Sequence, residues 1–164
     1  MHRRLIVMRH AKSSWDSDTI SDHDRPLNHR GRKDAPRIAN RLTQLGWTPN
    51  YVLSSDSERT RETCHRMFEC FDPPPESEFL RSLYHAGVQE FCAAVSQLAD
   101  GSTTTLVLGH NPGWEQVVHW LTNQSITMTT ANAALLEGPD LPWFETVLHP
   151  ARWQLAEVIR PQEL

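Results

Sequence analysis

The chain has 164 residues, a net charge of −4 with neutral histidines, and a pI of about 6.1. This length suits one domain with a hydrophobic core, so we expect a single domain over residues 1–164. The acidic balance gives no general attraction to nucleic acid or to anionic lipid. No apolar run approaches the roughly 18 residues of a membrane-spanning helix, so we expect neither nucleic acid nor a membrane as partner.

Short apolar segments alternate with segments in which apolar side chains recur at helical spacing. In chain order, the pattern predicts a strand over Arg4–Met8, a polar loop over Ser21–Asn28, a helix from near Gly31 to Leu45, a strand over Tyr51–Leu53, a helix from Glu58 that ends before Pro73, a strand at Phe79–Leu80, a helix over Val88–Leu98, a strand over Thr104–Leu108, a helix over Trp114–Leu121, and strands over Ala133–Leu136 and Trp153–Ile159.

This alternation of strands and helices predicts an α/β protein, a three-layer α/β/α sandwich with a mostly parallel sheet. The three cysteines, Cys64, Cys70 and Cys92, form no CxxC pair and lie in apolar surroundings. We therefore expect reduced, buried thiols, which are typical of a cytoplasmic protein. The two arginines before the first apolar run precede a segment that is too short for a signal peptide.

Polar side chains follow three of the predicted strands. Arg9 and His10 come after the first, Arg59 lies shortly after the second, and His110 and Asn111 follow the strand at Thr104–Leu108. In open α/β sheets, ligands bind outside the carboxyl ends of the strands. Because parallel strands end at the same edge, we expect these five side chains to meet in one site.

This set of residue types suits a phosphoryl group. Arginine presents forked donors that match phosphate oxygens, and histidine can attack phosphorus to form a covalent intermediate. The arginines would supply the positive charge that phosphoryl transfer needs, so we expect no metal and no cofactor. A metal site is the alternative, because the chain has nine histidines, but HxH and HExxH spacings are absent. The nucleotide-binding patterns GxxxxGK[ST] and GxGxxG are absent as well.

Five motifs in order resemble the histidine phosphatase superfamily, which has the phosphoglycerate mutase-like fold, and they are most similar to its SixA-type phosphohistidine phosphatases. They are "RHAKSSW" from Arg9, "DRPLNHRG" at Asp24–Gly31, "VLSSDSERTRET" at Val52–Thr63, "LYHAG" at Leu83–Gly87 and "LVLGHNPG" at Leu106–Gly113. The resemblance covers nearly the whole chain. Ala11 stands where the family's opening motif has a glycine.

The resemblance implies a role for each matching residue. His10 would be the nucleophile, while Arg9, Arg59 and His110 would hold the phosphoryl oxygens. Arg25 would lie near the mouth of the pocket. Asn111, which follows His110 at the same strand end, is a further candidate for contact with the substrate. The attacking nitrogen of His10 must be neutral, so we expect the other ring nitrogen to donate to a backbone carbonyl.

The segment after the third strand departs from the family pattern. Many members carry there a carboxylic acid that protonates the leaving oxygen, whereas this chain has Tyr84, His85 and Ala86. His85 is therefore the candidate general acid. A site without a strong acid favours substrates with a good leaving group, such as phosphohistidine, because an alkoxide needs a proton in the transition state.

The expected function is that of a phosphatase that works through a phosphohistidine intermediate on protein phosphohistidine, in cytoplasmic signal transduction. One alternative is a phosphomonoesterase that acts on small phosphorylated metabolites. Another is a phosphate- or phosphoprotein-binding module without turnover. The expected partner is thus a phosphorylated protein or a small phosphorylated substrate, and a monomer is the working expectation.

Overall fold

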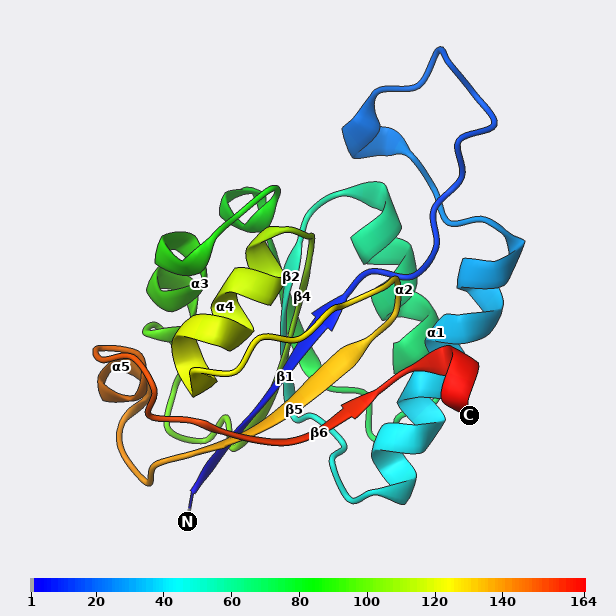
Figure 1. The fold of residues 1–164 in the computed structure, drawn as a ribbon. Helices are drawn as coiled ribbons and strands as arrows, with labels where there is room; N and C mark the ends of the chain where they lie inside the picture. The colour runs from blue at the N-terminus through cyan, green and yellow to red at the C-terminus, as the bar shows by residue number, and fades with distance from the viewer. Residues whose placement is uncertain (1) are drawn as a thin grey trace.

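The computed structural model describes residues 2–164, which form a six-stranded sheet between two layers of helices (Figure 1). The strands are β1 (Arg3–Arg9), β2 (Tyr51–Ser55), β3 (Glu76–Leu80), β4 (Thr104–Gly109), β5 (Ala133–Gly138) and β6 (Gln154–Ile159). The helices are α1 (His29–Gln44), α2 (Glu58–Phe68), α3 (Val88–Val95), α4 (Gly113–Thr122) and α5 (Trp143–Thr146), with 3-10 turns η1 (Asp22–Asp24), η2 (Arg81–Leu83) and η3 (Pro161–Glu163). All strands and helices expected from the sequence are present, and the structure adds the short α5 and the three 3-10 turns.

The strands lie in the order β3-β2-β4-β1-β5-β6. The first four are parallel, and β5 runs antiparallel to both of its neighbours. The expectation of a mostly parallel sheet is therefore confirmed, with β5 as the reversed strand. The cause is the segment between α4 and β5, which returns to the edge where β1 ends, since Ala131 N donates to His10 O there. The next strand can then only run back along the sheet.

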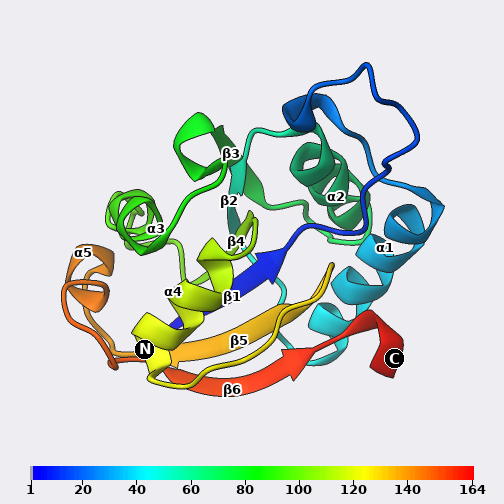
Figure 2. The ribbon, with the colours of Figure 1, turned by 45° about the horizontal axis from the view of Figure 1, so that its top comes forward.

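Each strand of the sheet centre presents alternate side chains to the two helical layers, as the period of a strand requires. Ile6 and Met8 of β1 pack into the core beneath α1 and α2, whereas Leu5 and Val7 pack into the core beneath α3, α4 and α5. All four side chains are fully buried. Figure 2 shows the two groups of helices on opposite faces of the sheet, which confirms the three-layer α/β/α sandwich.

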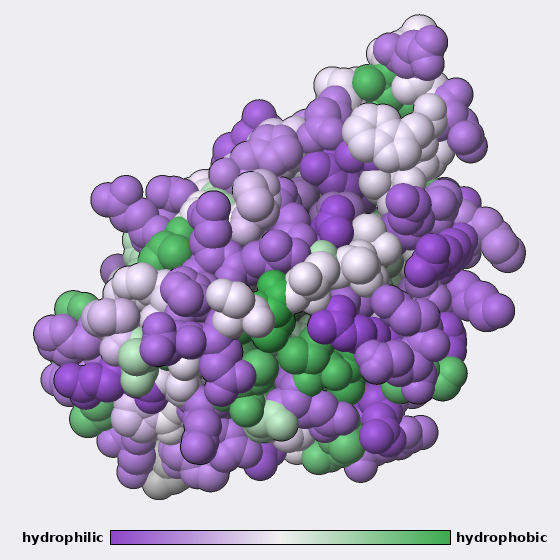
Figure 3. Space-filling model, viewed as in Figure 1, coloured by the Kyte–Doolittle hydropathy of each residue, from purple (hydrophilic) through white to green (hydrophobic). Residues whose placement is uncertain are grey.

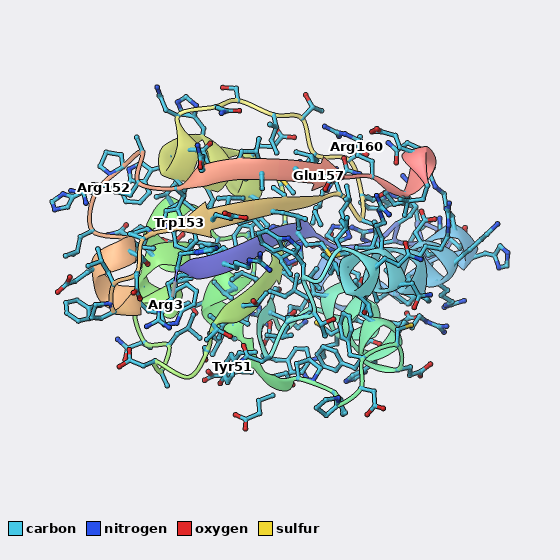
Figure 4. All side chains as sticks on the ribbon, turned by 90° about the horizontal axis from the view of Figure 1, so that it is seen from below. Arg3, Tyr51, Arg152, Trp153, Glu157 and Arg160 are labelled. Carbon is cyan, nitrogen blue, oxygen red and sulfur yellow. The ribbon has the colours of Figure 1, made fainter. Side chains whose placement is uncertain are left out.

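The two edge strands carry charged side chains that disfavour pairing with another sheet. Glu76 and Glu78 are exposed on β3, and Glu157 is exposed on β6, where Figure 4 shows it. The same view shows Arg3 and Tyr51, which belong to the amino ends of β1 and β2, away from the carboxyl ends where the candidate site lies.

All three cysteines are free thiols, with Cys64 buried and Cys70 and Cys92 half-buried. Burial raises the pKa of Cys64 to about 12 and that of Cys92 to about 11, so both are protonated near neutral pH. Within residues 2–164, none of the helices has the length and apolar character that crossing a membrane requires.

The segment that follows β1 is fixed against the start of α1. Asn28 N donates to Lys12 O, and the Asn28 side chain caps the helix by accepting from Gly31 N. A Cβ atom on Gly31 would lie 2.1 Å from Lys12 O. Glycine at this position therefore lets α1 approach the backbone that carries His10 and Ala11.

We predict that Gly31→Ala lowers the melting temperature, although alanine is normally the better helix former. The added methyl group would force the two backbones apart, which costs roughly 1–3 kcal/mol in an overpacked interior. Thermal unfolding followed by circular dichroism measures the change. Gly101→Ala is the matched control, because nothing lies within 4 Å of a Cβ atom there. Equal melting temperatures for the two variants would contradict the close approach.

Candidate active site

A pocket of about 210 Å³ lies at the carboxyl ends of β1 and β4, beside the first turn of α2. Side chains from the strand ends, the loop after β1, α2 and the turn after η2 line it. All seven residues expected from the sequence are among them: Arg9, His10, Arg25, Arg59, His85, His110 and Asn111. The side chains that follow the parallel strands therefore meet in one pocket, as the sequence predicts.

His10 is held at the base of this pocket by both its backbone and its ring. Its N–H donates to Gly109 O at 3.0 Å, and its carbonyl accepts from Ala131 N at 2.9 Å. The ring Nδ1 lies 2.7 Å from Ala11 O. A carbonyl oxygen can only accept, so Nδ1 carries the proton and Nε2 keeps its lone pair. This is the hydrogen bond that the sequence analysis expects of an attacking histidine.

The two buried histidines are neutral because of their surroundings. Burial, followed by the nearby Arg59 and Arg9 guanidinium groups, lowers the pKa of His10 to about 3. Burial, followed by His10 and Arg59, lowers the pKa of His110 to about 2. Each ring disfavours a proton where positive charge is already concentrated. Nε2 of His10 is therefore unprotonated at neutral pH, and no base is needed to deprotonate it.

Arg59 comes from the first turn of α2 and is only 2% exposed. Its Nη1 donates to Asp22 O at 2.7 Å, and its Nη2 donates to Asp22 Oδ2 at 3.1 Å and lies 3.3 Å from His110 Nδ1. The guanidinium makes His110 Nδ1 an acceptor, so His110 Nε2 donates to Ser55 Oγ at 2.8 Å. Both nitrogens of His110 thus have protein partners, and its expected contact with the phosphoryl oxygens stays a prediction.

Arg9 leaves the end of β1 with most of its donors unused. Its Nη1 donates to Met128 O at 3.0 Å, whereas its Nε is buried without a hydrogen-bond partner among residues 2–164. The Nε of Arg59 is buried and unpaired in the same way. Buried donors are normally paired, so two unpaired guanidinium N–H groups beside one pocket fit an anionic ligand.

Asn111 and Arg25 line the pocket, but protein groups take up most of their donors. Asn111 Nδ2 donates to Glu115 Oε2 and to Met128 O, which leaves its buried Oδ1 unpaired within the described residues. Arg25 donates to Ser13, Ser14 and Asp22, and it stacks 3.5 Å from the centre of the Trp15 ring. The expected role of both residues in substrate binding stays a prediction.

Five residues line the pocket that the sequence did not single out, namely Lys12, Ser13, Trp15, Asp22 and Thr130, and Asp22 is the one with a carboxylate. It lies in η1, within the segment between β1 and α1 that projects from the body and has a mainly hydrophilic surface (Figure 3). Partial burial works to raise the pKa of its carboxyl, but the Tyr84 hydroxyl and the guanidinium groups of Arg59 and Arg25 hold that pKa well below its usual range. Residues 16–24 include three further aspartates, Asp16, Asp18 and Asp24, without any periodic pattern, so only the folded chain distinguishes Asp22.

The residues that the structure describes, 2–164, contain no group of three or more His, Cys, Asp or Glu side chains that could hold a metal ion. The positive charge around the pocket comes from Arg9, Arg59, Arg25 and Lys12. The expectation that the reaction needs no metal stays a prediction, and its test is given below.

Comparison with known proteins agrees with this geometry. Residues 5–81 match the family model of the histidine phosphatase superfamily, branch 1. An uncharacterized chloroplastic protein of Arabidopsis thaliana is 38% identical over 97% of this chain and 78% of its own length. The chain belongs to the histidine phosphatase superfamily.

Solved structures share the fold. A Nakamurella multipartitia protein assigned to the phosphohistidine phosphatase SixA superposes with a TM-score of 0.84 at 23% identity, over 98% of this chain and 97% of its own. The protein histidine phosphatase SixA complexed with tungstate superposes with a TM-score of 0.82 at 22% identity, over 98% of each chain. These likenesses confirm the phosphoglycerate mutase-like α/β fold.

We predict that the imidazoles of His10 and His110 stay neutral at pH 5, because their lowered pKa values lie below that pH. Long-range ¹H–¹⁵N spectra should show a proton on Nδ1 of His10 and on Nε2 of His110. The variants His10→Gln and His110→Gln assign the signals. A midpoint near the ordinary value of 6.5 for either ring would contradict the burial and charge described here.

Proposed function

We propose that the protein is a phosphohistidine phosphatase in which His10 carries the phosphoryl group between two displacement steps. The observation that carries this proposal is the fixed tautomer of His10, whose Nδ1 donates to Ala11 O. Its Nε2 lone pair is thereby available in a pocket that also holds the Arg9 and Arg59 guanidinium groups.

The steps follow from these groups. The Nε2 lone pair of His10 attacks phosphorus, and the bond to the leaving group breaks with its electron pair on that group. Arg9 and Arg59 compensate the charge on the equatorial oxygens, which is the main demand of phosphoryl transfer. Water then attacks the phosphoryl group on His10, the N–P bond breaks, and its electron pair returns to Nε2. The products are the dephosphorylated substrate and inorganic phosphate.

The size of the pocket favours a substrate whose bulk stays outside it. Small-molecule sites commonly occupy about 300–1,000 Å³, and this pocket has about 210 Å³. Such a volume suits a phosphoryl group and its attached ring better than a whole metabolite. SixA, which has the same fold, has been solved in complex with tungstate, an oxyanion similar in shape to phosphate. This complex supports an oxyanion site in the present pocket.

A phosphomonoesterase acting on small metabolites is the second candidate function. The observation in its favour is His85, whose Nε2 lies 3.3 Å from Asp22 Oδ2 at the pocket. A histidine beside a carboxylate can protonate an oxygen leaving group. Phosphohistidine does not require such a donor, because its leaving group is an imidazole. The third alternative is a binding module without turnover. It would leave unexplained why a neutral histidine with a free Nε2 lone pair lies beside two arginines.

We further propose that residues 1–164 act as a single domain, as a monomer, in cytoplasmic signal transduction. The three free thiols support a reducing compartment. The charged edge strands support the monomer, because they disfavour pairing through the sheet.

The test of substrate class compares kcat/KM for a phosphohistidine-bearing protein with kcat/KM for 4-nitrophenyl phosphate. We expect the phosphohistidine protein to be the better substrate, because it also contacts the surface around the small pocket. His10→Ala should abolish both activities. A higher kcat/KM for the aryl ester would favour the phosphomonoesterase, and native-like turnover by His10→Ala would contradict the mechanism.

Arg9→Ala and Arg59→Ala should each lower kcat/KM by roughly a thousandfold, since a catalytic arginine in phosphoryl transfer has an effect of that order. Arg66→Ala is the matched control, because Arg66 lies on α2 in a surface ion pair with Glu62. It should leave the kinetics unchanged. Unaltered kinetics with a lowered melting temperature in the pocket variants would mark those arginines as structural.

Treatment with a chelator should leave the activity intact, because guanidinium groups supply the positive charge that a metal would otherwise provide. The measurement is turnover before and after dialysis against EDTA. A loss of activity that a divalent ion restores would contradict the expectation of a metal-free reaction.

A further inference from the structure

The pocket contains a carboxylate and a histidine in contact whose positions are 63 residues apart in the chain. Asp22 Oδ2 lies 3.3 Å from His85 Nε2, which is ion-pairing distance when the imidazole is protonated. The Tyr84 hydroxyl donates to the same carboxylate oxygen. Asp22 reaches this position on the segment between β1 and α1, and His85 follows the 3-10 turn η2.

We infer that Asp22 positions His85 and stabilises its imidazolium form, so that His85 can serve as the proton donor to the leaving group. The inference rests on the proposed function, since it assigns a role in the same displacement on phosphorus. Asp22 is a positioning residue in this scheme, because it acts through His85. The pair would supply the proton for which related enzymes use a carboxylic acid in this segment.

The conformation of His85 supports a fixed role for its ring. Its φ is +55°, in the left-handed region that residues other than glycine seldom adopt. The backbone next to it is held in place, because a Cβ atom on Gly113 would lie 1.8 Å from Ala86 O. The rings of Tyr84 and His85 contact each other, with centroids 4.0 Å apart. Strained residues that the surrounding structure holds in place are frequent at functional sites.

The groups that face His85 decide whether its imidazolium form is stable. Asp22 of η1 supplies the negative charge, and Tyr84 lies beside the ring on the same segment. His110, which follows β4, lies with its ring centroid 5.4 Å away and is neutral, as its lowered pKa requires. Arg59 of α2 lies behind the carboxylate, to which it donates. Asp22 is thus the anionic group in contact with this histidine.

The proton follows a balanced path in this scheme. With Nε2–H directed to Asp22, the Nδ1–H of the imidazolium donates to the leaving oxygen as the P–O bond breaks. The products of the first step are an alcohol, phosphorylated His10 and neutral His85. In the second step, His85 Nδ1 takes a proton from the attacking water, so the imidazolium is restored when phosphate forms. The same pair therefore serves both displacements.

The test measures kcat/KM for three substrates whose leaving groups differ in their need for a proton. These are phenyl phosphate, 4-nitrophenyl phosphate and a phosphohistidine protein. Asp22→Asn and His85→Ala should each lower kcat/KM strongly for phenyl phosphate, by about a hundredfold or more, because general acid catalysis contributes on that order. The loss should be smaller for 4-nitrophenyl phosphate and smallest for phosphohistidine.

Two further readouts separate positioning from a general structural effect. The double variant Asp22→Asn/His85→Ala should be no slower on phenyl phosphate than the slower single variant, as expected for residues that act as a unit. The pH profile for phenyl phosphate should change in Asp22→Asn and stay that of the wild type in Asp24→Asn, because only the first variant removes the carboxylate in contact with His85. Asp24→Asn is the matched control on the same turn, with a side chain that is 72% exposed.

Each outcome decides the inference. Equal losses on all three substrates would mean that Asp22 acts through Arg59 and would overturn the inference. Unchanged kcat/KM for phenyl phosphate in Asp22→Asn would overturn it as well. So would a wild-type protein that hydrolyses the other two substrates but not phenyl phosphate. If Asp22→Asn fails to fold, Asp22→Ser tests the same prediction. If neither variant folds, Asp22 is a structural residue and the inference is wrong. A wild-type protein that hydrolyses none of the three substrates would contradict the proposed function itself.

Discussion

The hydrogen bond from His10 Nδ1 to Ala11 O determines what the pocket can do, because it decides which ring nitrogen keeps a lone pair. The bond is possible only because the His10 backbone continues the ladder of β1, with its N–H on Gly109 O and its carbonyl on Ala131 N. The sheet therefore sets the direction of the His10 ring. A ring free to rotate or to exchange tautomers would present Nε2 to phosphorus only part of the time.

Concentrated positive charge is the second constraint on this site. Guanidinium groups are suited to bind a phosphoryl dianion. Burial, together with these same groups, disfavours a proton on His10 and His110, whose pKa values fall to about 3 and about 2. The pocket therefore combines fixed cations with neutral histidines. Asp22 is the exception, because it brings a carboxylate to Arg59 and to His85. Its 3.3 Å contact with His85 Nε2 is the geometry on which the inferred role of that histidine as proton donor rests.

Much of this arrangement could be predicted from the sequence, because it follows from local patterns. The apolar runs mark the strands, and the residues directly after them, such as His10 and His110, must lie at the carboxyl edge of a parallel sheet. The reversed direction of β5 could not be predicted in this way, since it depends on the path of the loop that brings Ala131 to His10. Asp22 could not be predicted either, because it reaches the pocket only through tertiary contacts with Arg25, Arg59 and Tyr84.

The roles of the pocket residues differ in how directly the contacts support them. His10 and Arg9 have a lone pair or unpaired donors that can meet a substrate. The donors of Arg25 and Asn111 are mostly taken by protein groups, so these residues support the pocket at least as much as they line it. Such support is itself functional, because phosphoryl transfer depends on groups that are held in position before the substrate binds.

The central claim is that His10 Nε2 becomes phosphorylated during turnover. The most direct measurement is rapid quenching of the protein with a ³²P-labelled phosphohistidine substrate, followed by peptide mapping of the label. The account predicts one labelled peptide that contains His10, with a phosphate that acid releases and base does not, and no label in His10→Ala. Turnover without any trapped label, or a label on another residue that persists in His10→Ala, would contradict it.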